Sequence, residues 1–181
     1  MPMSKLRQAL FPASALLFLL LINQTGFAGA EEFPVGTIIE RVTCEADATQ
    51  TYSLYLPSTY ASKSQWPIIY AFDPVARGNL PVKLFRDAAE KYGYIIVGSN
   101  NSQNGMQNAP LQAAISAMLK DTRKRFSIDE KRIYTTGFSG GARVATRVAS
   151  SCTGCVAGVI ACGAGFPSDI KPSSRTGFVL Y

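Results

Sequence analysis

A serine flanked by glycines is the residue of this sequence best suited to chemistry. It lies in a Gly-x-Ser-x-Gly motif, Gly137-Phe138-Ser139-Gly140-Gly141. β-Branched residues precede the motif and a helical pattern follows it, a setting typical of a sharp strand-to-helix turn that exposes the serine hydroxyl. Side chains at the outer glycines would clash across such a turn, and the following helix directs its N-terminal amides at the site. The motif predicts that Ser139 is a nucleophile; the alternative is a glycine-rich turn that contains a serine by chance.

A nucleophilic serine needs a base, and the sequence does not supply the usual one. A serine hydroxyl reacts slowly at neutral pH unless a neighbouring group takes its proton. None of the 181 residues is a histidine, so a Ser-His-Asp triad cannot form within them. Asp169 and Lys171 are candidates for a Ser-Lys arrangement, with ordinary surface charges as the alternative. The polar stretch Asn100-Asn101-Ser102-Gln103 either hydrogen-bonds a substrate or stabilises its own turns.

Strand and helix patterns alternate around the motif. Edge strands are predicted at 37–42 and 51–56, and buried strands at 66–72, 94–97, 132–136, 156–161 and 177–181. Helices are predicted at 81–92, 111–126 and 142–150, the first with Leu84, Phe85, Ala88 and Tyr92 on one face. Such alternation requires parallel crossovers. We therefore expect an α/β fold, a three-layer sandwich around a mostly parallel sheet.

The carboxyl ends of the predicted parallel strands indicate where a ligand would bind. Those ends are all rich in glycine, asparagine, serine or proline: 73–78, 98–105, 137–141 and 163–168. We expect them to meet at one rim that includes Ser139. A Rossmann-type nucleotide binder is the alternative, but no Gly-x-Gly-x-x-Gly follows the first buried strand.

The N-terminal residues predict a signal peptide. Lys5 and Arg7 precede an apolar run, 9–22, and Ala28-Gly29-Ala30 supplies small residues for cleavage. The run is short for a membrane-spanning helix. We therefore expect residues 1–30 to be removed and the mature protein to be exported, periplasmic or secreted, without stable membrane insertion. The net charge of +6 is scattered along the chain, which argues against a nucleic-acid partner.

Export would place the four cysteines in an oxidising compartment. The spacing of Cys152 and Cys155 predicts a structural disulfide or buried thiols, and Cys162 is expected in the core. A zinc site would need further ligands, and no histidine is present to provide one. We therefore expect neither a metal nor a cofactor.

Three segments together carry a resemblance to a known family. Phe72-Asp73-Pro74, then Ile128-Asp129-Glu130-Lys131-Arg132-Ile133-Tyr134, then the Gly-Phe-Ser-Gly-Gly motif resemble α/β-hydrolases over residues 36–181. More narrowly they resemble the secreted esterase group that includes polyhydroxybutyrate-depolymerase-like and feruloyl-esterase-like proteins. The resemblance implies hydrolysis of small-molecule or polymeric carboxylic esters through an acyl-enzyme on Ser139.

The same resemblance assigns the oxyanion hole to two backbone amides. Gly140, directly after the serine, matches one of them. The other comes from the loop after the first buried parallel strand, here 73–78. Pro74 has no amide hydrogen, so the resemblance leaves Asp73 and Val75 as candidates for the second donor.

The sequence departs from the family at its C-terminal side. The acid and the histidine of the family follow later strands, whereas this sequence ends at Tyr181 in the last predicted strand. We therefore expect residues 31–181 to form a partial α/β-hydrolase domain with little or no activity by itself. Two alternatives are a non-catalytic exported ligand-binding α/β protein that uses the same rim, and a peptidase on the same fold.

Overall fold

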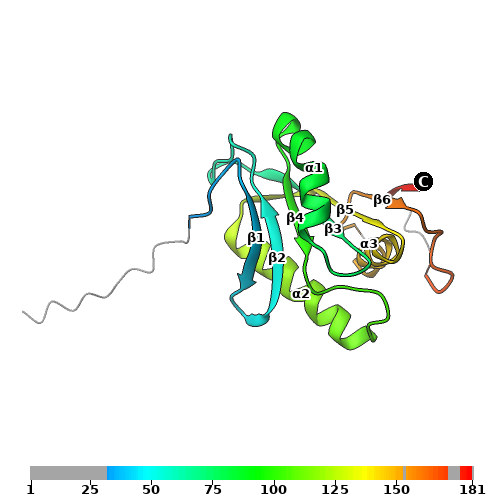
Figure 1. Cartoon of the computed structure of the whole chain (residues 1–181). Coiled ribbons are helices and arrows are strands. Elements are labelled where there is room, and N and C mark those ends of the chain that lie inside the picture. Colours follow the sequence, from blue (N-terminus) through cyan, green and yellow to red (C-terminus); the bar gives the residue numbers. More distant parts are fainter. Residues whose placement is uncertain (1–31, 153, 171–175, 181) are drawn as a thin grey trace, which may run out of the picture. The chain divides into compact units, whose positions relative to one another are not determined.

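A seven-stranded mixed sheet forms the centre of the computed structural model, which describes residues 32–152, 154–170 and 176–180. The predicted signal peptide, 1–30, lies outside these residues. The strands are β1 Ile38–Cys44, β2 Asp47–Tyr55, β3 Trp66–Phe72, β4 Ile95–Ser99, β5 Ile128–Phe138, β6 Gly158–Cys162 and β7 Gly177–Leu180. They lie side by side in the order β1-β2-β4-β3-β5-β6-β7. Figure 1 shows β1 and β2 at one edge of the sheet, next to β4. β4, β3, β5, β6 and β7 are parallel, and β1 and β2 add an antiparallel edge.

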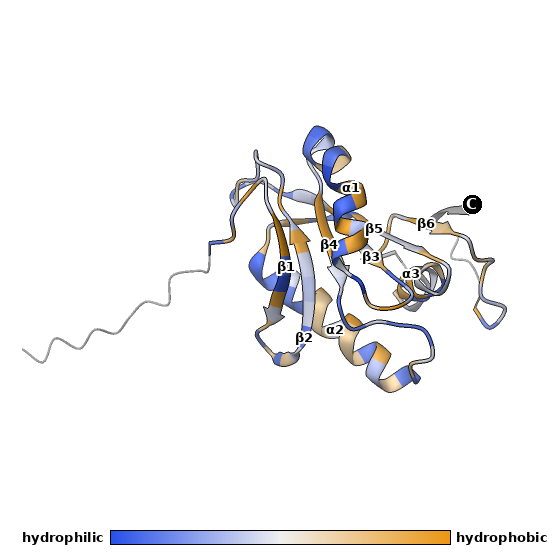
Figure 2. Cartoon of the chain, viewed as in Figure 1, coloured by the Kyte–Doolittle hydropathy of each residue, from blue (hydrophilic) through white to orange (hydrophobic). Residues whose placement is uncertain are grey.

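Helices cover both faces of this sheet. They are α1 Asn79–Tyr92, α2 Asn108–Arg125 and α3 Gly140–Ser151. On one face α1 packs against β2 and β4, and on the other α2 and α3 pack against the sheet around the larger part of the core. Figure 2 shows β4 as largely hydrophobic, whereas the helices carry both colours, as expected for elements with one buried face. The predicted α/β fold and its three layers are confirmed.

The central strands form because their side chains are apolar on both faces. In β3, Ile68, Tyr70 and Phe72 turn to the core beneath α2 and α3, while Ile69 packs against the cluster beneath α1. A strand buried on both sides needs this continuous apolar run, and the run Trp66–Phe72 was predicted on that basis. β5 begins at Ile128, earlier than the predicted start at 132.

The buried face of α1 differs from the prediction. The helix packs through Val82, Phe85 and Ala89, whereas Leu84 and Tyr92 are 74% and 65% exposed and Ala88 is exposed as well. The reason is a close approach of backbones at the start of the helix. A Cβ on Gly98 of β4 would lie 2.0 Å from the Gly78 carbonyl oxygen. This contact brings the start of the helix close to the sheet, where Val82 and Ala89 are buried.

The cysteines separate into one disulfide and two thiols. Cys152 and Cys155 form a disulfide at the end of α3, the first of the two outcomes that their spacing left open. Cys44 is a buried thiol, whereas Cys162, expected in the core, is half-buried at the end of β6. Among the described residues no helix is both long and apolar enough to cross a membrane.

Candidate active site

Ser139 lies at the sharp turn between β5 and α3. Its φ and ψ are 52° and −117°, so a non-glycine residue occupies a left-handed backbone conformation that costs free energy. The neighbouring elements hold it there. The Ser139 amide donates to the Cys162 carbonyl at 2.8 Å, and the Ser139 carbonyl accepts the amides of Ala142 and Arg143 at 3.1 and 3.4 Å. The serine is thereby fixed, half-buried, at the carboxyl end of the parallel sheet.

Both outer glycines of the motif are required by backbone contacts. A Cβ on Gly137 would lie 2.3 Å from the carbonyl carbon of Gly141, and a Cβ on Gly141 would lie 2.0 Å from the carbonyl oxygen of Phe72. These distances are far shorter than real carbon contacts. The start of α3 therefore packs directly onto β5 and β3, which only glycine permits.

The third glycine of the motif meets a side chain instead. A Cβ on Gly140 would lie 1.5 Å from Oδ1 of Asn104, a residue of the β4–α2 loop. Sequence reasoning did not identify Asn104. The available signal was Gly140 itself, because the turn requires glycine at the two outer positions and leaves the position after the serine free.

The β3–α1 loop is shaped by the carboxylate of Asp73. Its Oδ1 accepts the amides of Val75 at 2.9 Å and Arg77 at 3.2 Å, and the Arg77 guanidinium donates to both carboxylate oxygens at 3.1 and 3.0 Å. Burial by itself raises the pKa of Asp73, but the Arg77 side chain and the two amides outweigh it and hold the pKa below its usual value. The ionised carboxylate thus fixes this loop beside the serine.

This geometry distinguishes the two amides that the sequence left open for the oxyanion hole. The Val75 amide is donated to the Asp73 carboxylate. Among the described residues, the Asp73 amide has no hydrogen-bond acceptor. A Cβ on Gly141 would lie 3.2 Å from the Asp73 nitrogen, which places this amide against the start of α3. Of the two amides, that of Asp73 is therefore the better placed to donate a hydrogen bond to an oxyanion.

Two asparagines of the β4–α2 loop stabilise the loop rather than face a ligand. The Asn101 side chain accepts the Thr51 amide at 2.7 Å and donates to the Thr49 carbonyl at 3.1 Å. The Asn100 side chain donates to the Glu40 carbonyl and accepts the Ser53 hydroxyl, both at 3.1 Å. The turn-stabilising interpretation of these residues fits the structure.

Asp169 does not lie in a catalytic arrangement. Its carboxylate pairs with the Arg147 guanidinium of α3 at 2.7 and 2.9 Å on the surface. The hydrogen bond from Arg147 lowers the pKa of Asp169. Lys171, the other candidate for a Ser-Lys arrangement, lies outside the described residues. The surface-charge interpretation fits Asp169.

An apolar pocket of about 430 Å³ adjoins the turn on the side of α1. The helix contributes Leu80, Leu84 and Phe85, and the sheet contributes Phe138 and Cys162. Phe138, directly before the serine, is 62% exposed. Leu84, which is 74% exposed, forms part of the pocket wall.

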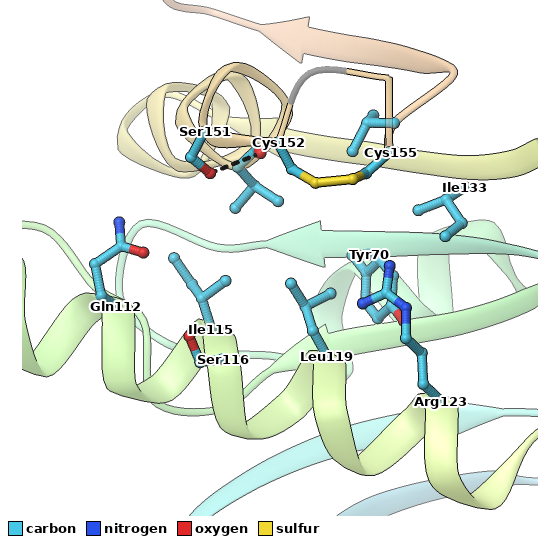
Figure 3. A pocket seen from close by; sticks show the side chains of 12 residues that line it. Tyr70, Gln112, Ile115, Ser116, Leu119, Arg123, Ile133, Ser151, Cys152 and Cys155 are labelled. Carbon is cyan, nitrogen blue, oxygen red and sulfur yellow. Dashed lines mark hydrogen bonds between the residues drawn. A yellow bond between two sulfur atoms is a disulfide. The ribbon is translucent and has the colours of Figure 1, made fainter. Parts of the chain in front are cut away.

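A second, smaller hollow lies between α2 and α3. Figure 3 shows Ile115 and Leu119 of α2 facing the Cys152–Cys155 disulfide, with Arg123 at one end. Arg123 is paired with Glu130 at 3.1 Å. This hollow contains no reactive arrangement comparable with the serine turn. The described part of the chain also holds no cluster of side chains that would bind a metal ion.

Known structures share this architecture. No protein-family model and no curated protein sequence matches the chain. Solved structures that it matches include an acetyl xylan esterase from Aspergillus awamori (17% identity, TM-score 0.54, 76% of this chain and 58% of that chain). A ferulic acid esterase (18%, 0.54, 70% and 59%) and an S-formylglutathione hydrolase from Staphylococcus aureus (11%, 0.58, 75% and 62%) match similarly. The chain thus spans less than two thirds of these structures, and at such identities the likeness concerns the fold.

Proposed function

We propose that this chain, which has the α/β-hydrolase fold, carries the nucleophile of a serine hydrolase that acts on carboxylic esters. The observation that carries the proposal is the conformation of Ser139. The left-handed backbone conformation of Ser139 costs free energy, so it persists only where the surrounding structure enforces it. The serine lies between two glycines that close backbone contacts require. Its place at the carboxyl end of a parallel sheet is where ligands bind in such folds. Esterases and a related hydrolase are among the matching structures, which supports the choice of reaction.

The proposed chemistry is acyl transfer in two steps. The Ser139 Oγ attacks the ester carbonyl carbon and gives its proton to a base, so that a C–O bond forms and a tetrahedral oxyanion appears. The alcohol then leaves with a proton, and water later hydrolyses the acyl-enzyme. The amides of Gly140 and Asp73 are the proposed donors to the oxyanion. Removal of one such donor costs about 3–4 kcal/mol of transition-state stabilisation.

The base is the part of this chemistry that the 181 residues do not provide in its usual form. With no histidine in the sequence, we propose that this chain by itself acylates Ser139 slowly. The apolar pocket beside Phe138 favours an ester with an apolar acyl or alcohol group. Export to an oxidising compartment is part of the proposal, and the Cys152–Cys155 disulfide supports it.

Chemical rescue tests the role of Ser139. The 181-residue chain is incubated with a fluorophosphonate, with and without dissolved imidazole as an external base, and the adduct is located by peptide mass spectrometry. Phosphonylation forms the Oγ–P bond, releases fluoride and transfers the serine proton to imidazole. We expect slow labelling that imidazole accelerates, confined to Ser139.

Two variants make the result specific. Ser139→Ala is expected to abolish the imidazole-dependent adduct, whereas Ser151→Ala, at the exposed end of the same helix, is expected to leave it unchanged. Equal labelling of Ser139→Ala and the parent chain would refute the proposed nucleophile. Fast labelling of Ser139 without imidazole would refute the claim that the chain lacks an effective base.

A further inference from the structure

We propose that Asn104 is a substrate-binding residue of the Ser139 site, and that residue 140 is a glycine because the Asn104 carboxamide occupies the space of a side chain there. The inference rests on the proposed role of Ser139 and adds a side-chain donor to the two backbone amides. Asn104 lies in the β4–α2 loop, between β4 and α2, and is exposed to solvent.

The contact between Asn104 and Gly140 is unusually close. A Cβ on Gly140 would lie 1.5 Å from Oδ1, 2.4 Å from Cγ and 2.8 Å from Nδ2 of Asn104. The whole carboxamide is therefore packed over the residue that follows the serine. The Cβ of an alanine at position 140 would clash with Asn104 in its observed position.

Two backbone contacts hold Asn104 in this position. Its amide donates to the Pro74 carbonyl at 2.8 Å, and an isolated β-bridge joins Gln103 to Val75. The β4–α2 loop is thereby tied to the β3–α1 loop that carries the proposed Asp73 donor. Asn104 lies where the two loops and the start of α3 meet.

Among the described residues, the Asn104 carboxamide differs from the carboxamides of Asn100 and Asn101 in having no hydrogen-bond partner. The side chains of Asn100 and Asn101 are hydrogen-bonded to β1 and β2. Among the described residues, none hydrogen-bonds the Asn104 side chain. Oδ1 is the atom nearest to the Cβ position on Gly140, so the NH2 group is the end left for a ligand acceptor.

An uncommitted amide donor next to the residue after the nucleophile suits an anionic oxygen. Side-chain amides of asparagine serve as oxyanion donors in other hydrolases, because the negative charge that develops during attack strengthens the hydrogen bond. Asn104 donates, in this proposal, to the carbonyl oxygen of the acyl group at Ser139. A phosphonyl oxygen bound to Ser139 takes the same place during labelling.

A double-mutant cycle tests both parts of the proposal. The rate of imidazole-dependent phosphonylation of Ser139 is measured in the 181-residue chain for Asn104→Ala, Gly140→Ala and the double variant. We expect each single change to slow labelling about 10- to 100-fold, as for loss of a donor to a charged oxygen. The double variant should be no slower than either single variant, because both changes remove the same group.

Further variants separate binding from folding. Asn104→Asp keeps the shape but replaces the donors with a negative charge, and it should label more slowly than Asn104→Ala. Gln107→Ala removes another exposed carboxamide, at the α2 end of the same loop, and should label at the parent rate. Thermal melts accompany each variant, and if Gly140→Ala fails to fold, the two Asn104 variants decide the question.

The outcomes distinguish this inference from the proposed function. Absence of any adduct on Ser139 in the parent chain overturns both. Labelling of Ser139 at equal rates in the parent and Asn104→Ala overturns the role of Asn104 alone. If Gly140→Ala slows labelling by the same factor with and without the Asn104 side chain, the pairing of the two residues is refuted.

Discussion

Asp73 and Asp121 are both buried aspartates with an arginine at the fourth following position, yet they act on different parts of the molecule. Asp73 precedes α1 in a loop at the rim, and its partner Arg77 has a side chain that is 57% exposed. Asp121 lies in the last turns of α2, and the side chain of its partner Arg125 is only 9% exposed. The same pair of residue types thus occurs once at the candidate site and once in the interior.

The partners of the two carboxylates explain the difference. Among the described residues, the Asp73 carboxylate binds only groups of its own loop, namely the amides of Val75 and Arg77 and the Arg77 side chain. Its interactions therefore restrict the backbone locally.

Asp121 joins segments that are distant in sequence. It accepts the Tyr52 hydroxyl of β2 and the Glu45 amide, each at 2.8 Å, and pairs with Arg125 Nε at 2.8 Å. Burial and then Asp121 raise the pKa of Tyr52, and the same two causes raise the pKa of the Cys44 thiol to about 11. The comparison indicates that Asp121 stabilises the whole domain and Asp73 the rim.

Asp121→Ala is expected to have the largest effect on stability. The change removes the carboxylate beside Arg125 and leaves the buried Tyr52 hydroxyl without its acceptor. Breaking a buried ion pair by removing one partner costs about 3–5 kcal/mol. Urea unfolding of the 181-residue chain, followed by circular dichroism, measures the loss.

A surface aspartate provides the control for that experiment. Asp87 of α1 pairs with Arg86, but its side chain is 87% exposed, and surface pairs contribute little. Asp87→Ala should change the free energy of unfolding far less. Equal losses for the two variants would contradict the assignment of Asp121 to the stabilising network.

The sequence predicted those features that depend on local pattern. Continuous apolar runs predicted β3 and the parallel sheet, because a strand covered on both faces needs them. The Gly-x-Ser-x-Gly spacing placed Ser139 between a strand and a helix, because the turn itself restricts the residues that fit.

Features that depend on how distant backbones meet were not predicted. The close contact of Gly78 with Gly98 at the start of α1 is one such feature, because helical periodicity does not encode it. Likewise, the sequence analysis named the Asp73 amide as a candidate donor but assigned no role to the Asp73 carboxylate. The hydrogen bond from the Val75 amide to this carboxylate forms only when the loop is folded. Asn104 was not predicted as a site residue, because its contact with Gly140, the first residue of α3, joins segments that are distant in sequence.

Asp73→Ala is expected to have a smaller effect on stability and a clear effect at the rim. Loss of the hydrogen bonds to two loop amides should cost about 1–2 kcal/mol, because water can solvate much of what is released. Without the carboxylate, the loop no longer holds the backbone amide of residue 73 in the proposed oxyanion position, so imidazole-dependent labelling of Ser139 should slow. Asp121→Ala, measured under conditions where it remains folded, should label nearly as fast as the parent. If Asp121→Ala slowed labelling and Asp73→Ala did not, the assignment of Asp73 to the rim and Asp121 to the interior would be contradicted.

The pH dependence of the Asp73 contribution is the smallest expected effect. Because the pKa of Asp73 is lowered in the folded chain, ionised Asp73 stabilises the fold fully above the unfolded pKa of about 4. That contribution declines as the pH falls through the lowered folded pKa. Asp73→Asn keeps an acceptor for the Val75 amide but removes the titrating charge. The difference in unfolding free energy between the parent and Asp73→Asn should therefore shrink between about pH 6 and pH 3.

Measuring this difference, rather than the parent alone, removes the contribution of the surface carboxylates. Glu40, Glu90 and Asp169 also have lowered pKa values through hydrogen bonds to neighbouring side chains, and they titrate in both proteins alike. A difference that stayed constant over this pH range would mean that the charge of Asp73 contributes nothing and that its shape alone holds the loop. The rim would then owe its geometry to the Asp73 acceptor oxygens, and the charged pair with Arg77 would be incidental.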